Sequence, residues 1–161
     1  SVISAVDLIK GIGILAGFRN VEVEGATGNI DTNFYGKAQA ALKELESGQD
    51  FVYLHIEAPD ECGHRHEIEN KVKSIELIDD RIVGPIIEGL EKYDDYRILI
   101  LPDHPTPLSL RTHTAEPVPF LLYQKTNPKK SGVTGYDELQ AAKTGIIFND
   151  GYKLMDHFIL D

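Results

Sequence analysis

Cysteine is almost absent from this 161-residue sequence, which contains only Cys62. A single cysteine excludes an internal disulfide framework and is typical of a reducing, cytoplasmic environment. It also argues against a structural zinc site, because such sites normally recruit several cysteine thiolates. We therefore expect a cytoplasmic protein that depends on a packed core, and a chain of this length can bury enough surface to form one.

An excess of basic residues is also missing. The chain has 16 Lys and Arg against 26 Asp and Glu, which leaves a formal net charge of −10. This balance argues against a nucleic-acid partner and against docking on an anionic membrane surface. An acidic protein can still bind a phosphorylated substrate where metal ions or a local basic cluster reverse the sign of the charge.

No apolar run is long enough to cross a bilayer. The most apolar stretch, Val2 to Phe18, carries Asp7 and Lys10 in its middle and has neither a basic leader nor a cleavage site. Its apolar residues recur at helical spacing up to Gly17, which predicts a buried helix. The chain starts with Ser rather than Met, so we expect processing or truncation upstream.

The remaining pattern predicts alternating strands and helices. Strands are expected at 21–24, 51–56, 97–101 and 118–123, helices at 34–46, 67–93 and 151–159, and loops at 25–33 and 126–135. Pro85 removes a backbone donor and predicts a kink near residues 81–85. The order strand, helix, strand within 51–101 is a βαβ unit, which implies parallel pairing. The predicted fold class is α/β, a mostly parallel sheet with helices on both faces.

Acidic and histidine side chains follow two of the predicted strands. Asp60 and His64 come after the first, and Asp103 and His104 come directly after the second. In open α/β sheets, ligands bind beyond the carboxyl ends of the strands, so these residues are expected to face one crevice. His113 lies in the loop before the next strand, which can return it to the same place.

Two carboxylates and three imidazoles suit transition-metal ions. Mixed His and Asp sets favour Mn²⁺, Zn²⁺ or Fe over Ca²⁺ and Mg²⁺, which prefer oxygen ligands. Five candidates exceed the needs of one tetrahedral ion and suggest two metals, about 3.5–4 Å apart in phosphoryl-transfer sites. The plainer alternative treats each Asp as a turn or cap residue and each His as a bystander. Three such segments at strand ends favour the metal site.

Four segments are distinctive in combination. They are Val52–His64 (VYLHIEAPDECGH), Leu101–Pro107 (LPDHPTP), His113–Pro119 (HTAEPVP) and the spacer Gly25–Asn33 (GATGNIDTN). Together they resemble the archaeal-type, cofactor-independent phosphoglycerate mutases of the alkaline phosphatase superfamily. The likeness runs from about Ser4 to Tyr123 and implies an alkaline-phosphatase-like α/β fold.

The resemblance also implies how two metal ions are held. One ion takes Asp60, His64 and His113, and the other takes Asp103 and His104. The second ion also takes an Asp and a nucleophilic Ser from the family's N-terminal region, and neither appears in this chain; the family's inserted substrate domain is missing too. Residues 1–161 are thus expected to be the C-terminal part of the metal-binding domain, inactive alone. Mn²⁺ is the expected ion, with Zn²⁺, Co²⁺ or Mg²⁺ as alternatives.

In that family a serine takes the phosphoryl group of 3-phosphoglycerate and returns it to the 2-position, and the resemblance implies this reaction for the full-length protein. The expected partner is therefore a small phosphorylated substrate. Two alternatives stay open: another phosphomutase or phosphatase of the same superfamily, because the metal ligands are shared, and a non-catalytic remnant of the fold. Missing N-terminal strands would expose a sheet edge, so self-association is a further expectation.

Overall fold

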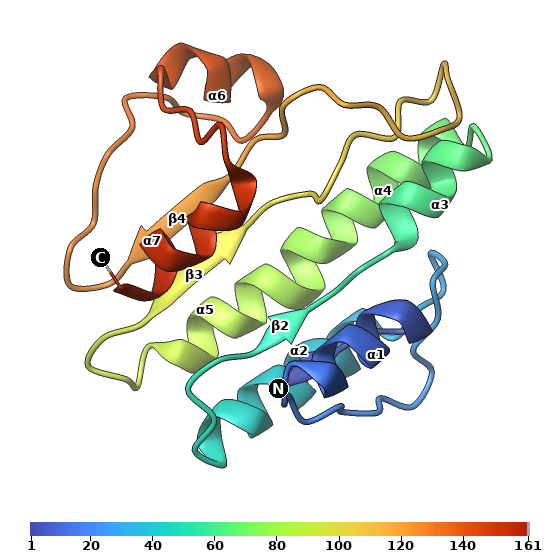
Figure 1. Cartoon of the computed structure of the whole chain (residues 1–161). Helices are drawn as coiled ribbons and strands as arrows, with labels where there is room; N and C mark the ends of the chain where they lie inside the picture. Colours follow the sequence, from blue (N-terminus) through green and yellow to red (C-terminus); the bar gives the residue numbers. More distant parts are fainter. Residues whose placement is uncertain (161) are drawn as a thin grey trace. The chain divides into compact units, whose positions relative to one another are not determined.

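The first strand of the protein lies where the sequence predicts a helix. The computed structural model describes residues 1–160 (Figure 1), and β1 (Val2–Ile3) pairs in parallel with β2 (Tyr53–Leu54). Both residues of β1 are 1% exposed, and the amide of Tyr53 donates to the carbonyl of Ser1 at 2.8 Å. The prediction of one helix from residue 2 was wrong because a distant strand binds this segment.

Helix α1 (Asp7–Leu15) follows, and it is not the buried helix that its apolar character predicts. Leu8 is 70% exposed and Leu15 is 90% exposed. The close contact is made instead by Gly13, where an added Cβ would lie 2.6 Å from Cγ1 of Val2. The helix therefore packs against β1 at a glycine, while large apolar side chains such as Leu8 and Leu15 face solvent.

Residues 21–24 do not form the predicted strand. Asn20 makes one isolated bridge to Val2, and the segment then passes into the loop 25–33. Helix α2 (Phe34–Glu46) begins as predicted, because the Asn33 side chain accepts a hydrogen bond from the amide of Gly36 at 2.9 Å.

The long helix predicted for residues 67–93 is a succession of helical segments. It comprises α4 (Ile68–Ile78), the π-helical turn η1 (Asp79–Val83) and α5 (Gly84–Leu90), and it is preceded by the short helix α3 (Ala58–His64). The π-helical turn lies directly before Gly84 and Pro85, where the missing proline donor is expected to disturb the helix. The core packs beneath these helices around Phe34, Ala38, Ala58 and Ile82.

The chain folds as two compact units, Ser1–Lys92 with Thr106–Thr112, and Tyr93–Pro105 with His113 onward. The second unit contains β3 (Arg97–Ile100) paired antiparallel with β4 (Leu121–Gln124). Within residues 1–160, β2 and β3 belong to separate two-stranded sheets, so the predicted parallel pairing was wrong. The α/β composition is confirmed, although each sheet is small.

The end of the chain is more helical than predicted. Helix α6 (Glu138–Thr144) was not expected, although its signals are present: the Asp137 side chain caps the amide of Gln140 at 2.8 Å, and Gly145 ends the helix with φ 69°. The 3₁₀ turn η2 (Gly151–Lys153) and α7 (Leu154–Leu160) replace the single helix predicted for 151–159. None of the helices in the described part of the chain has the length and apolar character that a membrane span requires.

Candidate metal centre

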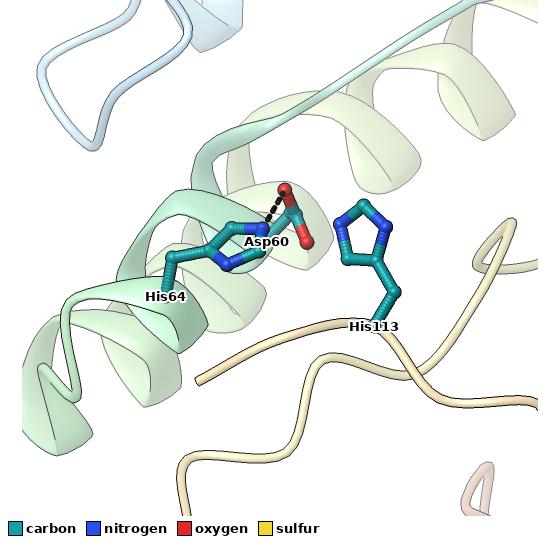
Figure 2. A group of neighbouring side chains, drawn as sticks. All are labelled: Asp60, His64 and His113. Carbon is teal, nitrogen blue, oxygen red and sulfur yellow. Dashed lines mark ion pairs between the residues drawn. The ribbon is translucent and has the colours of Figure 1, made fainter. Parts of the chain in front are cut away.

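Helix α3 presents Asp60 and His64 on one face. The two residues are four positions apart, which places them one above the other on a helix. Nε2 of His64 lies 3.3 Å from Oδ2 of Asp60, and both side chains are partly exposed (Figure 2). The first turn of α3 also carries Glu61, and Pro59 is its second residue; acidic residues and a proline are both favourable at a helix start.

A backbone carbonyl decides which nitrogen of His64 faces Asp60. Nδ1 lies 2.9 Å from the carbonyl oxygen of Arg111, and because a carbonyl can only accept, Nδ1 carries the proton and donates. Nε2 then faces a carboxylate oxygen, either with a second proton, which would form an ion pair, or with a lone pair that a metal ion can accept. Two acceptors 3.3 Å apart repel each other unless a proton or a metal ion lies between them. Histidine ligands of metals are commonly held by such a contact from their other nitrogen.

Thr106 holds the other oxygen of the carboxylate. Its hydroxyl donates to Oδ1 of Asp60, and the residue itself is only 5% exposed. The carbonyl of Thr106 accepts from Nζ of Lys71 at 2.7 Å. Gly63 permits this approach, because a Cβ there would lie 2.6 Å from the Thr106 carbonyl oxygen. Thr106 was not among the residues expected at the site, although it directly follows Pro105 in the segment LPDHPTP.

The segment 106–112 forms several hydrogen bonds with the rest of the first unit. Nδ1 of His66 donates to the carbonyl of Leu108 at 2.6 Å, and Nδ1 of His64 donates to the carbonyl of Arg111 at 2.9 Å. His66 and Arg111 both have positive φ, 58° and 55°, which non-glycine residues adopt at a cost. The strained conformation of Arg111 directs its carbonyl at His64.

The other three predicted ligands lie together in the second unit. Nε2 of His104 is 3.3 Å from Oδ2 of Asp103, which repeats the spacing of the first pair. The rings of His104 and His113 stack with centroids 3.6 Å apart. The amide of Thr114 donates a hydrogen bond to the carbonyl of Pro105 at 3.2 Å. This bond joins the two ends of the segment 106–113.

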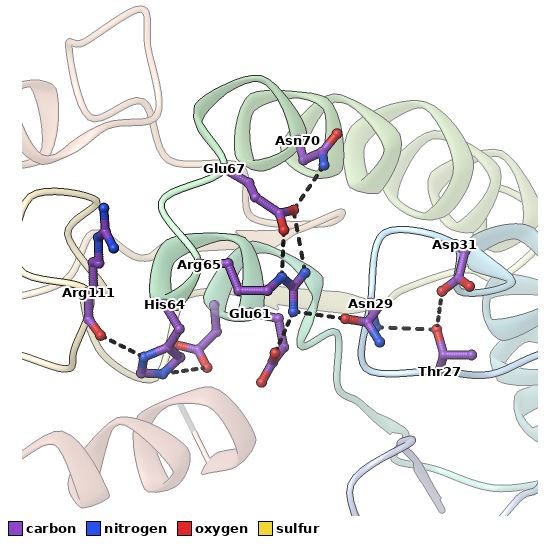
Figure 3. Close-up of polar contacts among 10 residues, drawn as sticks. Thr27, Asn29, Asp31, Glu61, His64, Arg65, Glu67, Asn70 and Arg111 are labelled. Carbon is purple, nitrogen blue, oxygen red and sulfur yellow. Dashed lines mark hydrogen bonds and ion pairs between the residues drawn. The ribbon is translucent and has the colours of Figure 1, made fainter.

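Arg65, one position after His64, connects α3 to the loop 25–33. Its guanidinium bonds Glu61 at 2.6 Å, Glu67 at 2.6 Å and the side-chain oxygen of Asn29 at 3.0 Å (Figure 3). Within the loop, the hydroxyl of Thr27 donates to Asp31 at 2.7 Å. Since these side chains are exposed, the contacts position the loop more than they stabilise the fold.

The donors in both units fit a divalent transition metal. Each unit has a carboxylate oxygen beside an imidazole nitrogen, and such mixed oxygen and nitrogen sets suit Mn²⁺ and Zn²⁺. Arg111 and Thr106 bond Nδ1 of His64 and Oδ1 of Asp60, so Nε2 and Oδ2 are the atoms that can face an ion. In the first unit, hydrogen bonds from surrounding residues therefore orient Asp60 and His64 toward each other.

Comparison with known proteins agrees with this chemistry. The profile of the Metalloenzyme superfamily matches residues 1–159. The chain is 56% identical to a probable 2,3-bisphosphoglycerate-independent phosphoglycerate mutase of Geobacter sulfurreducens over 97% of its length, and 50% identical to the phosphoglycerate mutase of the same type from Methanothrix thermoacetophila over 96%. It covers 39% of each of these relatives, so it spans about two-fifths of their length.

A solved structure has the same fold. The PH0037 protein of Pyrococcus horikoshii superposes with a TM-score of 0.77 at 33% identity, over 88% of this chain and 42% of that one. The expected resemblance to cofactor-independent phosphoglycerate mutases and the alkaline-phosphatase-like fold are confirmed. The family implies a divalent metal. Because the family profile matches residues 1–159, the chain belongs to the Metalloenzyme superfamily.

Proposed function

We propose that this chain is the metal-binding C-terminal part of a phosphoglycerate mutase that works without 2,3-bisphosphoglycerate and requires divalent ions. One observation carries the proposal: Nε2 of His64 and Oδ2 of Asp60 lie 3.3 Å apart, close enough for a single metal ion to be bound by both. The reaction is proposed from the relatives, because the Geobacter sulfurreducens and Methanothrix thermoacetophila proteins are named phosphoglycerate mutases.

One ion is assigned to Asp60, His64 and His113. These residues offer one carboxylate and two imidazole donors, a set suited to Mn²⁺ or Zn²⁺. Covalent continuity supports including His113: Arg111 contacts His64, and two peptide units keep the Cα of His113 within about 8 Å of the Cα of Arg111.

The second ion is assigned to Asp103 and His104. Two protein ligands are too few for a closed site, so its remaining ligands, and the serine nucleophile, belong to sequence outside this chain. Mn²⁺ is the ion proposed for both positions, because mixed Asp and His sets without cysteine suit it. The substrate proposed is 3-phosphoglycerate, and the product is 2-phosphoglycerate.

When bound, divalent ions stabilise charge on a transferring phosphoryl group and lower the pKa of a serine hydroxyl. This chain supplies metal-ligand atoms that neighbouring residues keep in a fixed orientation. His64 is fixed by its Nδ1–H bond to Arg111, and Asp60 is fixed by the hydroxyl of Thr106. Positioning of this kind means that little rearrangement is needed when the ion binds.

A titration of the full-length protein with Mn²⁺ after chelation tests the metal site. His113→Ala should weaken binding at least tenfold, about 1.4 kcal/mol, whereas the matched control His157→Ala, at a histidine on α7 outside the proposed ligand set, should bind as the wild type does. Equal affinity in the wild type and His113→Ala would remove His113 from the site. No binding by the wild type would favour the non-catalytic remnant.

The reaction is tested by ³¹P NMR of 3-phosphoglycerate incubated with the Mn²⁺-loaded protein. A signal for 2-phosphoglycerate supports the mutase. Inorganic phosphate in its place would identify a phosphatase of the same superfamily, and no turnover of phosphoglycerate with Mn²⁺ bound would point to another phosphomutase.

We also propose a cytoplasmic location for the protein and self-association of the isolated chain. A cytoplasmic location is supported by the one cysteine, Cys62, which is buried and forms no disulfide. Self-association of the isolated chain is supported by the apolar side chains that α1 leaves outward, among them Leu8, Ile12 and Leu15. A monodisperse monomer by light scattering would contradict the second proposal.

A further inference from the structure

Lys71, on α4, extends to the segment 106–112 beside helix α3. Its ammonium group donates to the carbonyl oxygen of Thr106 at 2.7 Å, a length typical of a hydrogen bond from a charged donor. Thr106 is only 5% exposed, and a buried backbone carbonyl needs a donor because water cannot reach it. Lys71 supplies such a donor from 35 positions away in the chain.

The contact between Lys71 and Thr106 lies against the backbone of α3. A Cβ added at Gly63 would be 2.6 Å from the Thr106 carbonyl oxygen and 2.9 Å from Nζ of Lys71, so both atoms pack on the helix at the residue before His64. A glycine at this position leaves room for them, because a larger residue would displace one or both. Lys71 therefore joins α4, the segment 106–112 and α3 at one point.

Thr106 connects Lys71 to the proposed ligand Asp60. The hydroxyl of Thr106 donates to Oδ1 of Asp60, while its carbonyl accepts from Lys71, so one residue is held through two of its polar groups. A buried carbonyl that loses its donor moves toward another donor or toward water, because leaving it unsatisfied costs about 1–3 kcal/mol. The hydroxyl of the same residue moves with it. The position of the Asp60 carboxylate therefore depends on Lys71.

We propose that Lys71 is a positioning residue for Asp60 and acts through Thr106. The inference rests on the proposed metal site. Lys71 holds the Thr106 carbonyl, Thr106 holds its hydroxyl against Oδ1 of Asp60, and Oδ2 is thereby directed toward His64. The family resemblance assigns ligands only, and neither Lys71 nor Thr106 is among them.

The test is the Mn²⁺ affinity of the full-length protein, read from the electron paramagnetic resonance signal of free Mn²⁺. Lys71→Met removes the donor from a side chain of similar length and should weaken binding at least tenfold, the range found when groups that orient metal ligands are removed. Coulomb's law alone predicts the opposite sign, because removing a positive charge near a cation site strengthens cation binding. Lys73→Met, at an exposed lysine on the same helix, is the matched control and should bind as the wild type does.

A conservative variant separates positioning from packing. Lys71→Arg keeps positively charged N–H donors and should recover most of the affinity that Lys71→Met loses. Equal losses in the methionine and arginine variants would assign the effect to packing and overturn the inference.

A double-mutant cycle with Thr106→Val tests the route from Lys71 to Asp60. If Lys71 acts through Thr106, Lys71→Met should weaken Mn²⁺ binding little further in a protein that already lacks the Thr106 hydroxyl. Losses that multiply in the double variant would mean that the two residues act separately, and they would overturn the inference.

Thermal unfolding of the metal-free proteins checks that each variant folds. Lys71→Gln, whose amide nitrogen is one bond closer to the backbone than the ammonium group, replaces Lys71→Met if that variant does not fold, and the same loss is expected of it. Wild-type affinity in a folded Lys71→Met or Lys71→Gln would overturn the inference while leaving the metal site intact. Absence of Mn²⁺ binding by the wild type would overturn both.

Discussion

Replacement of Thr106 by valine should weaken metal binding without disturbing the shape of the site. Valine has nearly the same volume as threonine but cannot donate a hydrogen bond to Oδ1 of Asp60. The carbonyl of Thr106, which accepts from Lys71 at 2.7 Å, belongs to the backbone and is kept. The variant therefore removes one interaction from the proposed ligand.

The size of the effect follows from the burial of the two partners. A hydrogen bond to a charged group contributes about 1.5–3 kcal/mol to stability. The Asp60 side chain is 24% exposed, so water can replace part of the lost interaction, whereas Thr106 is only 5% exposed. We expect the metal-free protein to lose about 1–2 kcal/mol of unfolding free energy, and Mn²⁺ affinity to fall about tenfold.

Urea denaturation of the chelated protein measures the first quantity, and Mn²⁺ titration measures the second. Thr106→Ser, which keeps the hydroxyl and loses the methyl group, should retain most of the metal affinity. Wild-type Mn²⁺ affinity in Thr106→Val would refute the view that Thr106 orients Asp60. Equal losses in the valine and serine variants would assign the effect to packing of the methyl group.

Three further outcomes are expected. Gly63→Ala should lower the free energy of unfolding by about 1–3 kcal/mol in urea denaturation and weaken Mn²⁺ binding, because its Cβ would lie 2.6 Å from the Thr106 carbonyl oxygen. An unchanged free energy of unfolding and an unchanged Mn²⁺ affinity would mean that the segment 106–112 can move away without cost. Phe34→Ala, in the core of the first unit, should cost about 3–5 kcal/mol by the same assay, and a loss below about 1 kcal/mol would contradict its core role. Burial, with a smaller contribution from Glu138, raises the pKa of Tyr136 to about 12, and its hydroxyl lies 3.2 Å from two backbone carbonyls. Because the folded pKa is raised above 10.0, this stabilisation is complete below about pH 10 and is lost as the pH rises toward 12; ultraviolet titration should show a late tyrosine ionisation that Tyr136→Phe abolishes.

Local signals in the sequence were sufficient for some elements. Helix α2 was predicted with its correct ends, because its interior is rich in helix-forming residues, and in the structure the Asn33 side chain caps its start. The disturbance before Pro85 was also predicted, and it takes the form of a π-helical turn at Asp79–Val83. Both features depend on interactions within a few residues of the chain.

Elements that depend on distant partners were misassigned. Val2 and Ile3 have helical spacing with later residues, yet β2 binds them as a strand from about fifty positions away. The segment 21–24 alternates like a strand, but only Asn20 finds a bridge partner. Helix α3 was not predicted, and its residues were placed only as a segment after a strand, although Pro59 near its start and the acidic first turn are compatible with a helix.

The types and spacing of the candidate ligands were determined by the sequence alone: a carboxylate and an imidazole four residues apart, an adjacent Asp-His pair, and a third histidine before the next strand. Only the tertiary structure decided how these groups are oriented. The carbonyl that sets the tautomer of His64 comes from Arg111, 47 positions along the chain, and the hydroxyl that holds Asp60 comes from Thr106, 46 positions along. The contact between Lys71 and the carbonyl of Thr106 has the same origin, since hydrogen bonds depend on distances in space that residue spacing does not specify.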